Sequence, residues 1–158
     1  MVDRQEYERV AQELLPTLYK IAMGILRADA DARDAVQQAL LKAWEKRGGA
    51  RSGSFRGFLT RIVINECRNI QRERMRVFPA DLNAMPAASA PPDYQELYAA
   101  LWALPETLRL PVLLKYLHDY SEKEAAQSLG IPVTTFKSRL HRARAALRKA
   151  LDREVIFE

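Results

Sequence analysis

The positively charged side chains near the end of the chain are the residues best suited to bind a charged partner. Residues 133–153 hold seven Lys or Arg against a single acidic residue, Asp152. Cationic side chains at this density neutralise phosphates, so they predict contact with a polyanion such as nucleic acid. A charge run can also be merely a solvated helix face, and for this segment alone that alternative stays open.

A second basic segment lies in the middle of the chain. Residues 47–76 hold eight Arg against Glu66 and Glu73, a net charge of +6. The whole chain carries only +5, so the residues outside the two basic segments are acidic on balance. Two separate basic surfaces on an otherwise acidic chain predict two contacts with a polyanion.

The C-terminal cations lie on a predicted helix-turn-helix. Ser121 and Glu124 have the spacing of a capping box, Gly130 is a typical helix stop, and Pro132 suits the start of a second helix. The second helix is expected to bury Phe136, Leu140, Ala143, Leu147 and Leu151. Two helices joined by a short Gly-containing turn, the second one cationic, are typical of proteins that read the major groove of DNA.

The remaining elements predict an all-α fold with two small helical domains. Residues 1–76 form the first domain and 94–158 the second, because the Pro/Ala-rich segment 77–93, with four prolines, predicts a flexible linker. No alternating pattern typical of strands stands out.

Within the first domain three helices are predicted. The apolar pattern of 14–26 predicts the first, although Pro16 weakens it. The acidic run 29–34 is expected to supply caps and first-turn charges for the second, and the third begins near Ser54. In the second domain, the residues expected to face inward before the helix-turn-helix are Val112, Leu113, Tyr116 and Leu117.

Composition disfavours several other classes of protein. The single cysteine, Cys67, cannot form a disulfide within the chain and argues against a cysteine-based metal site. There is no paired His/carboxylate motif, phosphate-binding Gly-rich loop or nucleophile elbow, so we expect neither an enzyme nor a cofactor or metal. No apolar run reaches the roughly 18 residues of a membrane span and the N-terminus is polar, so a cytoplasmic protein without membrane insertion is expected.

Three segments, taken in order, resemble the motifs of one family. They are 31–44 (DARDAVQQALLKAW), 54–74 (SFRGFLTRIVINECRNIQRER) and 130–144 (GIPVTTFKSRLHRAR). They are similar to regions 2.2, 2.3–2.4 and 4 of the bacterial group 4 sigma factors, the extracytoplasmic-function (ECF) type of the sigma-70 family. The chain departs from the family pattern by having Gln38, Phe58 and Asn69 in place of Glu, Trp and Asp, and Thr134-Thr135-Phe136 in place of Gly-Thr-Val.

The resemblance implies a promoter-specificity subunit of RNA polymerase. Residues 1–76 would be region 2, which binds core polymerase and the −10 element, and 94–158 would be region 4, which binds the −35 element. The implied partners are the β′ clamp helices and β flap of core polymerase, promoter DNA, and an anti-sigma factor, often membrane-anchored in the family. The implied role is −10 melting and transcription initiation in a stress or envelope response.

The resemblance also assigns residues to three surfaces. The residues expected to bind core polymerase are Asp34, Gln37, Gln38, Leu41 and Trp44. Those expected to bind the −10 element, in part around a flipped base, are Arg51, Ser52, Ser54, Phe55, Arg61, Asn65, Arg68 and Arg72, with Arg74 and Arg76 as further phosphate contacts. Those expected to bind the −35 element are Thr135, Lys137, Ser138, Arg139, His141, Arg142 and Arg144.

Some of these roles have structural alternatives. Trp44 can equally be a core aromatic, Asn65 a polar residue on a helix face, and His141 a solvent-facing histidine. Arg142 is the candidate for a bidentate guanine contact, because Arg pairs with two guanine acceptors in the major groove. Arg139 and Arg144 are expected to grip phosphates, which adds affinity but little sequence information.

Two other functions compete with the sigma-factor interpretation. One is a helix-turn-helix regulator that binds duplex DNA without polymerase, and segment 31–44 disfavours it. The other is a sigma mimic that only sequesters an anti-sigma factor, and the two basic faces disfavour that. Binding to core polymerase and initiation of transcription would separate the three.

Overall fold

The protein is described by a computed structural model at residues 3–49, 54–77 and 94–151. Every regular element within these ranges is helical, which confirms the predicted all-α class. None of the helices described there is both long and apolar enough to cross a membrane. The chain divides into two compact units, the first holding α1 to α3 and the second holding α4, α5, α7 and the start of α6. The proposed linker, apart from Val77, lies outside the described residues.

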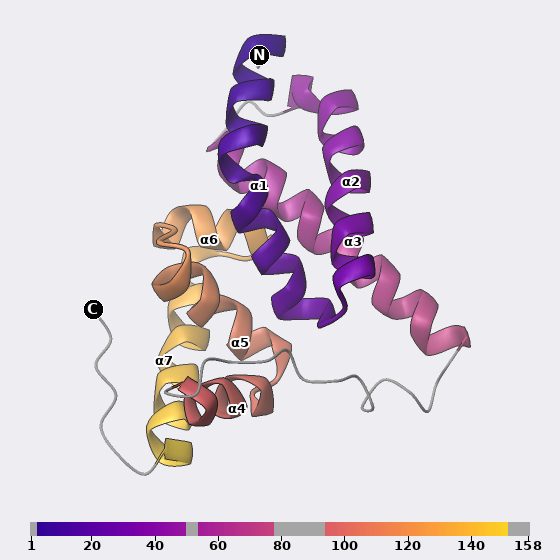
Figure 1. Cartoon of the computed structure of the whole chain (residues 1–158). Helices are drawn as coiled ribbons and strands as arrows, with labels where there is room; N and C mark the ends of the chain where they lie inside the picture. Colours follow the sequence, from indigo (N-terminus) through magenta and orange to yellow (C-terminus); the bar gives the residue numbers. More distant parts are fainter. Residues whose placement is uncertain (1–2, 50–53, 78–93, 152–158) are drawn as a thin grey trace. The chain divides into compact units, whose positions relative to one another are not determined.

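The first unit is a bundle of three helices, α1 (Arg4–Leu26), α2 (Asp29–Glu45) and α3 (Phe55–Val77), with a 3-10 turn, η1 (Arg47–Gly49), after α2. Figure 1 shows α1 and α2 side by side and α3 crossing them. The spacing between packed helices depends on the side chains at the contact, so small ones allow a close approach. The buried face of α2 is made mostly of such residues, namely Ala32, Ala35, Ala39 and Ala43.

The first helix is longer than its apolar pattern alone predicts. The carboxylate of Asp3 accepts a hydrogen bond from the Glu6 amide at 2.8 Å and caps the N-terminus. Pro16 lies inside the helix without ending it. A proline in a helix interior costs about 3 kcal/mol, and burial of Leu18 and Ile21 against the other helices offsets this cost.

The corner between α1 and α2 differs from the prediction. The acidic run 29–34 predicts a side-chain cap for α2, but the N-cap residue is Ala28, whose side chain makes no capping bond. Asp29 and Asp31 lie in the first turn instead, where negative charge is favoured by the helix dipole. The corner bends at Arg27, which has a φ of 59° and donates its amide to the carbonyl of Met23 at 3.1 Å.

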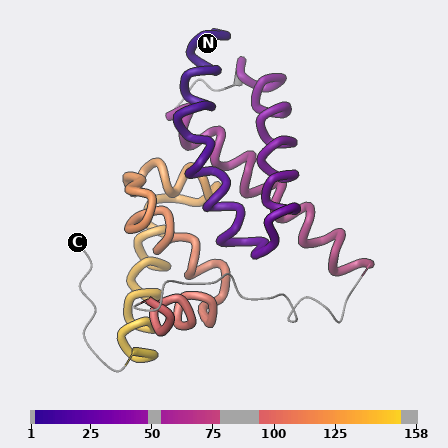
Figure 2. The backbone as a smooth tube through the Cα atoms, viewed as in Figure 1, coloured from indigo at the N-terminus to yellow at the C-terminus, as the bar shows by residue number. Residues whose placement is uncertain are grey.

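The second unit contains α4 (Gln95–Ala103), α5 (Glu106–Val112), a π-helical turn η3 (Leu113–Leu117), the start of α6 (Glu122–Leu129) and α7 (Val133–Leu151). Both α4 and α5 pack on α7, and the tube in Figure 2 follows this path from α4 to the end of α7. The largest fully buried side chains in this unit belong to Leu110, Leu114, Tyr120, Phe136 and Leu147.

The prediction that Tyr116 and Leu117 face the core is wrong, because they lie in a π-helical turn. Val112 and Leu113 are buried as expected, but Tyr116 is half-buried and Leu117 is 61% exposed. Tyr116 and Leu117 lie within this turn, where each helical turn holds more than 3.6 residues, so their side chains rotate away from the face that 3.6-residue spacing predicts. Leu114 is fully buried in this turn.

Candidate functional site

The cationic face of α7 is set by the apolar face on the other side of the same helix. Phe136, Leu140, Ala143, Leu147 and Leu151 are all buried, as their spacing predicts. Four of the predicted −35 residues are exposed opposite them, and we call these the reading face: Lys137, Ser138, His141 and Arg142. They lie within two turns of one another, close enough to face a few adjacent base pairs in a major groove.

Local hydrogen bonds hold both ends of α6, a capping box at its start and backbone bonds in the turn that follows it. The Glu124 amide donates to the Ser121 hydroxyl at 3.0 Å, and the Ser121 amide donates to the Glu124 carboxylate at 3.3 Å. This is the predicted capping box. Gly130 has a φ of 68°, and the Ile131 amide donates to the Ala126 carbonyl at 3.0 Å, which together close a Schellman motif. The start of α6 and the turn after it are therefore stabilised by hydrogen bonds between residues that are close in sequence.

The remaining −35 residues are less open to solvent than the reading face. Thr135 and Arg139 are half-buried. Arg144 is also half-buried, and its guanidinium donates to the hydroxyl of Tyr116 at 3.1 Å. Arg144 therefore has a structural partner within its own unit, which sequence reasoning about phosphate contacts missed.

The predicted −10 residues of α3 form a band along one side of the helix. At 100° per residue, Arg61, Asn65, Arg68 and Arg72 fall within about 60° of one another and span about 16 Å. We call this band the basic stripe. Arg61, Asn65 and Arg72 are exposed and Arg68 is half-buried. Val63, Ile64 and Cys67 turn toward the core, and each is fully buried.

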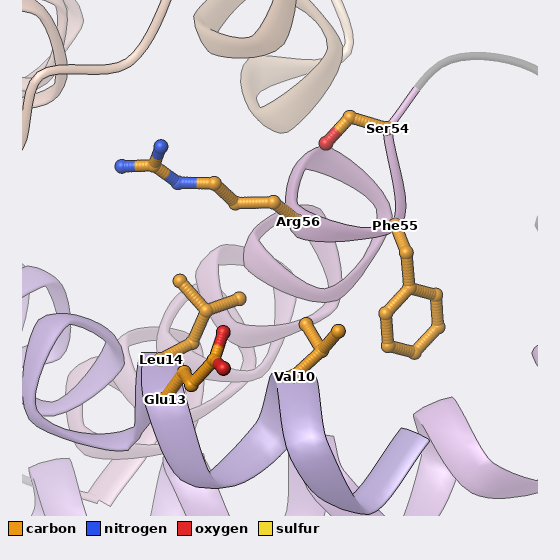
Figure 3. Close-up of a pocket in the computed structure, with 6 residues that line it drawn as sticks. All are labelled: Val10, Glu13, Leu14, Ser54, Phe55 and Arg56. Atoms are coloured by element: carbon orange, nitrogen blue, oxygen red, sulfur yellow. The ribbon is translucent and has the colours of Figure 1, made fainter. Parts of the chain in front are cut away.

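The start of α3 borders a small cavity in the first unit. Its volume is about 360 Å³, and Figure 3 shows Val10, Glu13 and Leu14 of α1 facing Phe55 and Arg56. Ser54 also lines it, but its hydroxyl accepts the Gly57 amide at 3.1 Å and so caps α3.

The residues expected around a flipped base are only partly brought together. Ser54 and Phe55 line the cavity, whereas Asn65 lies ten residues further along α3, a rise of about 15 Å. Arg51 and Ser52 lie outside the described residues. The Phe55 ring also has a structural role, because it packs against Tyr7 at 6.0 Å and Phe58 at 5.7 Å between ring centroids.

The predicted polymerase-binding residues lie on the exposed side of α2. Asp34, Gln37, Gln38 and Leu41 are all exposed, and we call them the docking face. Leu41 is 62% exposed, a large apolar side chain among polar neighbours. Exposed apolar residues rimmed by polar ones are typical of protein-binding sites.

Trp44, unlike the exposed residues of the docking face, is packed against other side chains. Its ring meets Tyr7 edge-on at 5.1 Å, and the Arg47 guanidinium lies 3.6 Å from the ring centroid. The Tyr7 hydroxyl donates to the Leu40 carbonyl at 2.5 Å, and burial raises the pKa of Tyr7 above its usual value. Trp44 is half-buried, so most of its surroundings fit the alternative in which it is a core aromatic.

A groove beside the docking face was not anticipated. It has a volume of about 560 Å³ and is lined by Leu15, Pro16 and Tyr19 of α1 and by Arg33, Val36, Gln37 and Leu40 of α2. Leu15, which belongs to the apolar pattern of 14–26, is 46% exposed, and Leu40 is half-buried. Adjacent Leu14 and Leu15 lie 100° apart on a helix, so both cannot face one core. At the rim, a hydrogen bond to Asp29 raises the pKa of the Tyr19 hydroxyl.

Ion pairs between α2 and α3 are a further feature that the sequence did not reveal. Lys42 pairs with the largely buried Glu66, and Asp31 pairs with Arg74. Arg74 is predicted to contact DNA phosphates, but its side chain is only 19% exposed and faces the α1–α2 corner. Its charge is therefore satisfied within the bundle.

Comparison with known proteins identifies the family of this chain. A model of sigma-70 region 2 matches residues 10–77, and a model of sigma-70 region 4 matches residues 94–147. The chain is 31% identical over 154 residues to the ECF RNA polymerase sigma factor SigM of Mycobacterium tuberculosis, covering 94% of this chain and 79% of that protein. The chain belongs to the ECF sigma factors of the sigma-70 family.

Two further similarities extend over most of this sigma factor. It is 28% identical to the ECF sigma factor SigE of Mycolicibacterium smegmatis, covering 92% of this chain but only 61% of that protein. The solved structure of the sigma factor RpoE from Bartonella quintana, in complex with the anti-sigma factor NepR, matches with a TM-score of 0.73 and 28% identity. That match covers 92% of this sigma factor and 98% of the other chain.

Proposed function

We propose that this ECF sigma factor binds core RNA polymerase through its first unit and directs it to promoters by contacts from both units. In this proposal residues 1–76 act as region 2, residues 77–93 as a tether, and residues 94–158 as region 4. The observation that carries it is the pairing, within one three-helix bundle, of a mostly uncharged docking face on α2 with an arginine-rich stripe on α3. A bundle that only bound DNA would have no use for the first of these.

The docking face and the groove beside it support the polymerase contact. Gln37 belongs to both, so the two surfaces are continuous. The β′ clamp helices would contact the docking face, with Leu41 contributing an apolar anchor. Trp44 would support this face from behind, since its ring is packed on Tyr7.

The basic stripe supports the −10 contact. Arg61, Arg68 and Arg72 would follow the phosphates of the opened strand, and Asn65 lies among them as the side chain able to read a base edge. The cavity beside Phe55 would accept a base turned out of the stack. Unstacking costs a few kcal/mol, and a ring at the cavity wall offsets part of that cost by stacking.

The reading face supports the −35 contact. Arg142 would donate hydrogen bonds to guanine O6 and N7, while Lys137 and Arg139 would contact phosphates. Two weak DNA contacts joined by a tether act at a raised effective concentration, so neither unit alone needs high affinity. The β flap would hold the second unit on the polymerase.

An anti-sigma factor is the proposed regulator of these surfaces. The similar RpoE structure is a complex with the anti-sigma factor NepR. A partner that covers the docking face or the reading face would prevent formation of active holoenzyme. We expect such control to serve a stress or envelope response, with the protein acting in the cytoplasm.

Transcription from sheared genomic DNA of the source organism tests the proposal even though the promoter sequence is not known. Purified full chain is added to core polymerase, and the 5′ ends of the transcripts are mapped. We expect start sites that share −35 and −10 sequences and disappear when the protein is omitted. Binding to duplex DNA without binding to core polymerase would favour the regulator alternative. Binding to core polymerase without initiation at any site would contradict the proposal.

A further inference from the structure

Arg74 joins three helix ends in the first unit. One guanidinium nitrogen, Nη2, donates to the Asp31 carboxylate in the first turn of α2. The other, Nη1, donates to the carbonyl of Leu26, the last residue of α1, at 3.2 Å. Arg74 itself lies near the end of α3, so its side chain reaches residues 43 and 48 positions away in sequence. We call this arrangement the corner latch.

The corner latch supplies what the two connected helix ends lack. The last turn of α1 contains no basic residue, although a cation there is favoured by the helix dipole and can bind unpaired carbonyls. The N-cap of α2, Ala28, makes no side-chain bond. Arg74 provides the cation for α1 and holds the first-turn carboxylate of α2, so a residue distant in sequence completes both ends.

The end of α3 is weakly packed. The last fully buried residue on this helix is Cys67, and the ten residues from Arg68 to Val77 include none. Met75 and Val77 are 58% and 52% exposed, and Figure 1 and Figure 2 show these turns continuing past α1 and α2. Arg72, which belongs to the basic stripe, lies within this weakly packed segment.

We propose that Arg74 is a positioning residue that fixes the direction of the last turns of α3, and with them Arg72, for −10 DNA without touching DNA itself. This inference rests on the proposed −10 function of the basic stripe. A nearby arginine provides the contrast: Arg72 is exposed, and its guanidinium donates to Asn69 on the same helix. Arg74, in contrast, is bonded to both of the other helices.

Exchanging the charges of the corner latch separates a positioning role from a phosphate contact. The full chain is prepared as wild type, Arg74→Asp, Asp31→Arg and the double variant with both changes, with Arg72→Asp as a matched control on the same helix. Two quantities are measured. One is amide hydrogen exchange over residues 68–77. The other is the affinity of the reconstituted holoenzyme for promoter DNA, with the promoter taken from the mapped start sites.

Asp31→Arg is the most informative single change, because it adds two units of positive charge. General electrostatics would then strengthen DNA binding, whereas loss of the latch predicts weaker binding, by about tenfold for one lost charge-assisted hydrogen bond. We expect both single variants to lose exchange protection at 68–77 and DNA affinity. The double variant should recover part of both, because the exchanged pair restores the contact between α2 and α3 but not the hydrogen bond to the Leu26 carbonyl. Arg72→Asp should lose affinity with protection unchanged.

Three results would overturn the inference. Tighter DNA binding by Asp31→Arg would show that charge alone matters. Recovered protection with DNA binding still lost in the double variant would make Arg74 a phosphate contact. Unchanged protection in both single variants would show that no latch exists. Absence of DNA binding by wild-type holoenzyme would instead contradict the proposed function, and hydrogen exchange would still decide whether the latch holds α3.

Discussion

The arginine-rich helices α3 and α7 reach their orientation in different ways. The first is tied to α2 by two ion pairs, Lys42–Glu66 and Asp31–Arg74, each joining residues far apart in sequence. The second has no acidic residue between 133 and 151 and is oriented by its buried apolar face. Charge therefore shapes the first unit internally, whereas in the second it is mostly turned outward.

This difference shows why counting cations overestimates a DNA-binding surface. On α3, Arg74 forms an ion pair with Asp31, and Glu66 forms an ion pair with Lys42. On α7, Arg144 donates a hydrogen bond to the neutral hydroxyl of Tyr116. Basic residues on both helices thus have structural partners, and a count of cations in the sequence does not reveal them.

The largest expected effect comes from the apolar orientation of α7. Replacing the fully buried Phe136 with Ala should destabilise the second unit by about 3–5 kcal/mol, through lost burial and a residual cavity. Hydrogen exchange in the full chain should show faster exchange throughout α5 and α7 and little change in α1 and α2. Equal loss of protection in both units would show that their stabilities are not separate.

The next largest effect concerns the reading face. Arg142→Ala should cost about 1–3 kcal/mol on the cognate −35 sequence, because a bidentate guanine contact is lost. The loss on a scrambled sequence should be smaller, and anisotropy titration at fixed salt measures both. Arg148→Ala, an exposed control on the same helix, should weaken both sequences alike. The same behaviour from Arg142→Ala would make Arg142 a phosphate contact.

A moderate effect is expected on the docking face of the first unit. Gln37→Ala should weaken binding to core polymerase by about 1 kcal/mol, the net value of one hydrogen bond. Surface-immobilised core enzyme measures this, with Gln12→Ala on α1 as an exposed control. Unaltered affinity would remove Gln37 from the docking face.

The smallest effect tests the partner of Arg144. Tyr116→Phe removes the hydroxyl that accepts its hydrogen bond, and should lower stability by about 0.5 kcal/mol, the low end for a hydrogen bond, because this pair is only part-buried. A double-mutant cycle with Arg144→Ala should show that the two losses are not additive. Additive losses would mean that the hydrogen bond contributes nothing in solution.

Sequence reasoning succeeded where structure is decided locally. The capping box of Ser121 and Glu124, the left-handed Gly130 and the buried face of α7 all formed as predicted, because each depends on residues within a few turns. The exposed state of Gln37 and Gln38 also agrees with the assignment by family resemblance. Their binding role stays a prediction.

The predictions that were wrong concern features that leave no pattern in the nearby sequence. Apolar spacing predicts an inward Leu117, but the π-helical turn rotates it outward. The acidic run at 29–34 predicts a cap for α2, whereas Ala28 occupies the cap and Asp31 turns to Arg74. Neither a π-helical turn nor a pairing partner 43 residues away leaves a periodic pattern in a single sequence.

By itself, the sequence determined the helical class, the helix-turn-helix and the two basic segments, because apolar spacing, caps and charge are local properties of the chain. The tertiary structure alone decided which arginines face solvent. Burial near a helix end or a carboxylate makes an internal partner favourable for a guanidinium, and that choice depends on how α1, α2 and α3 meet. Arg72 and Arg74 lie two residues apart in the sequence, yet only the bundle distinguishes the exposed side chain from the latched one.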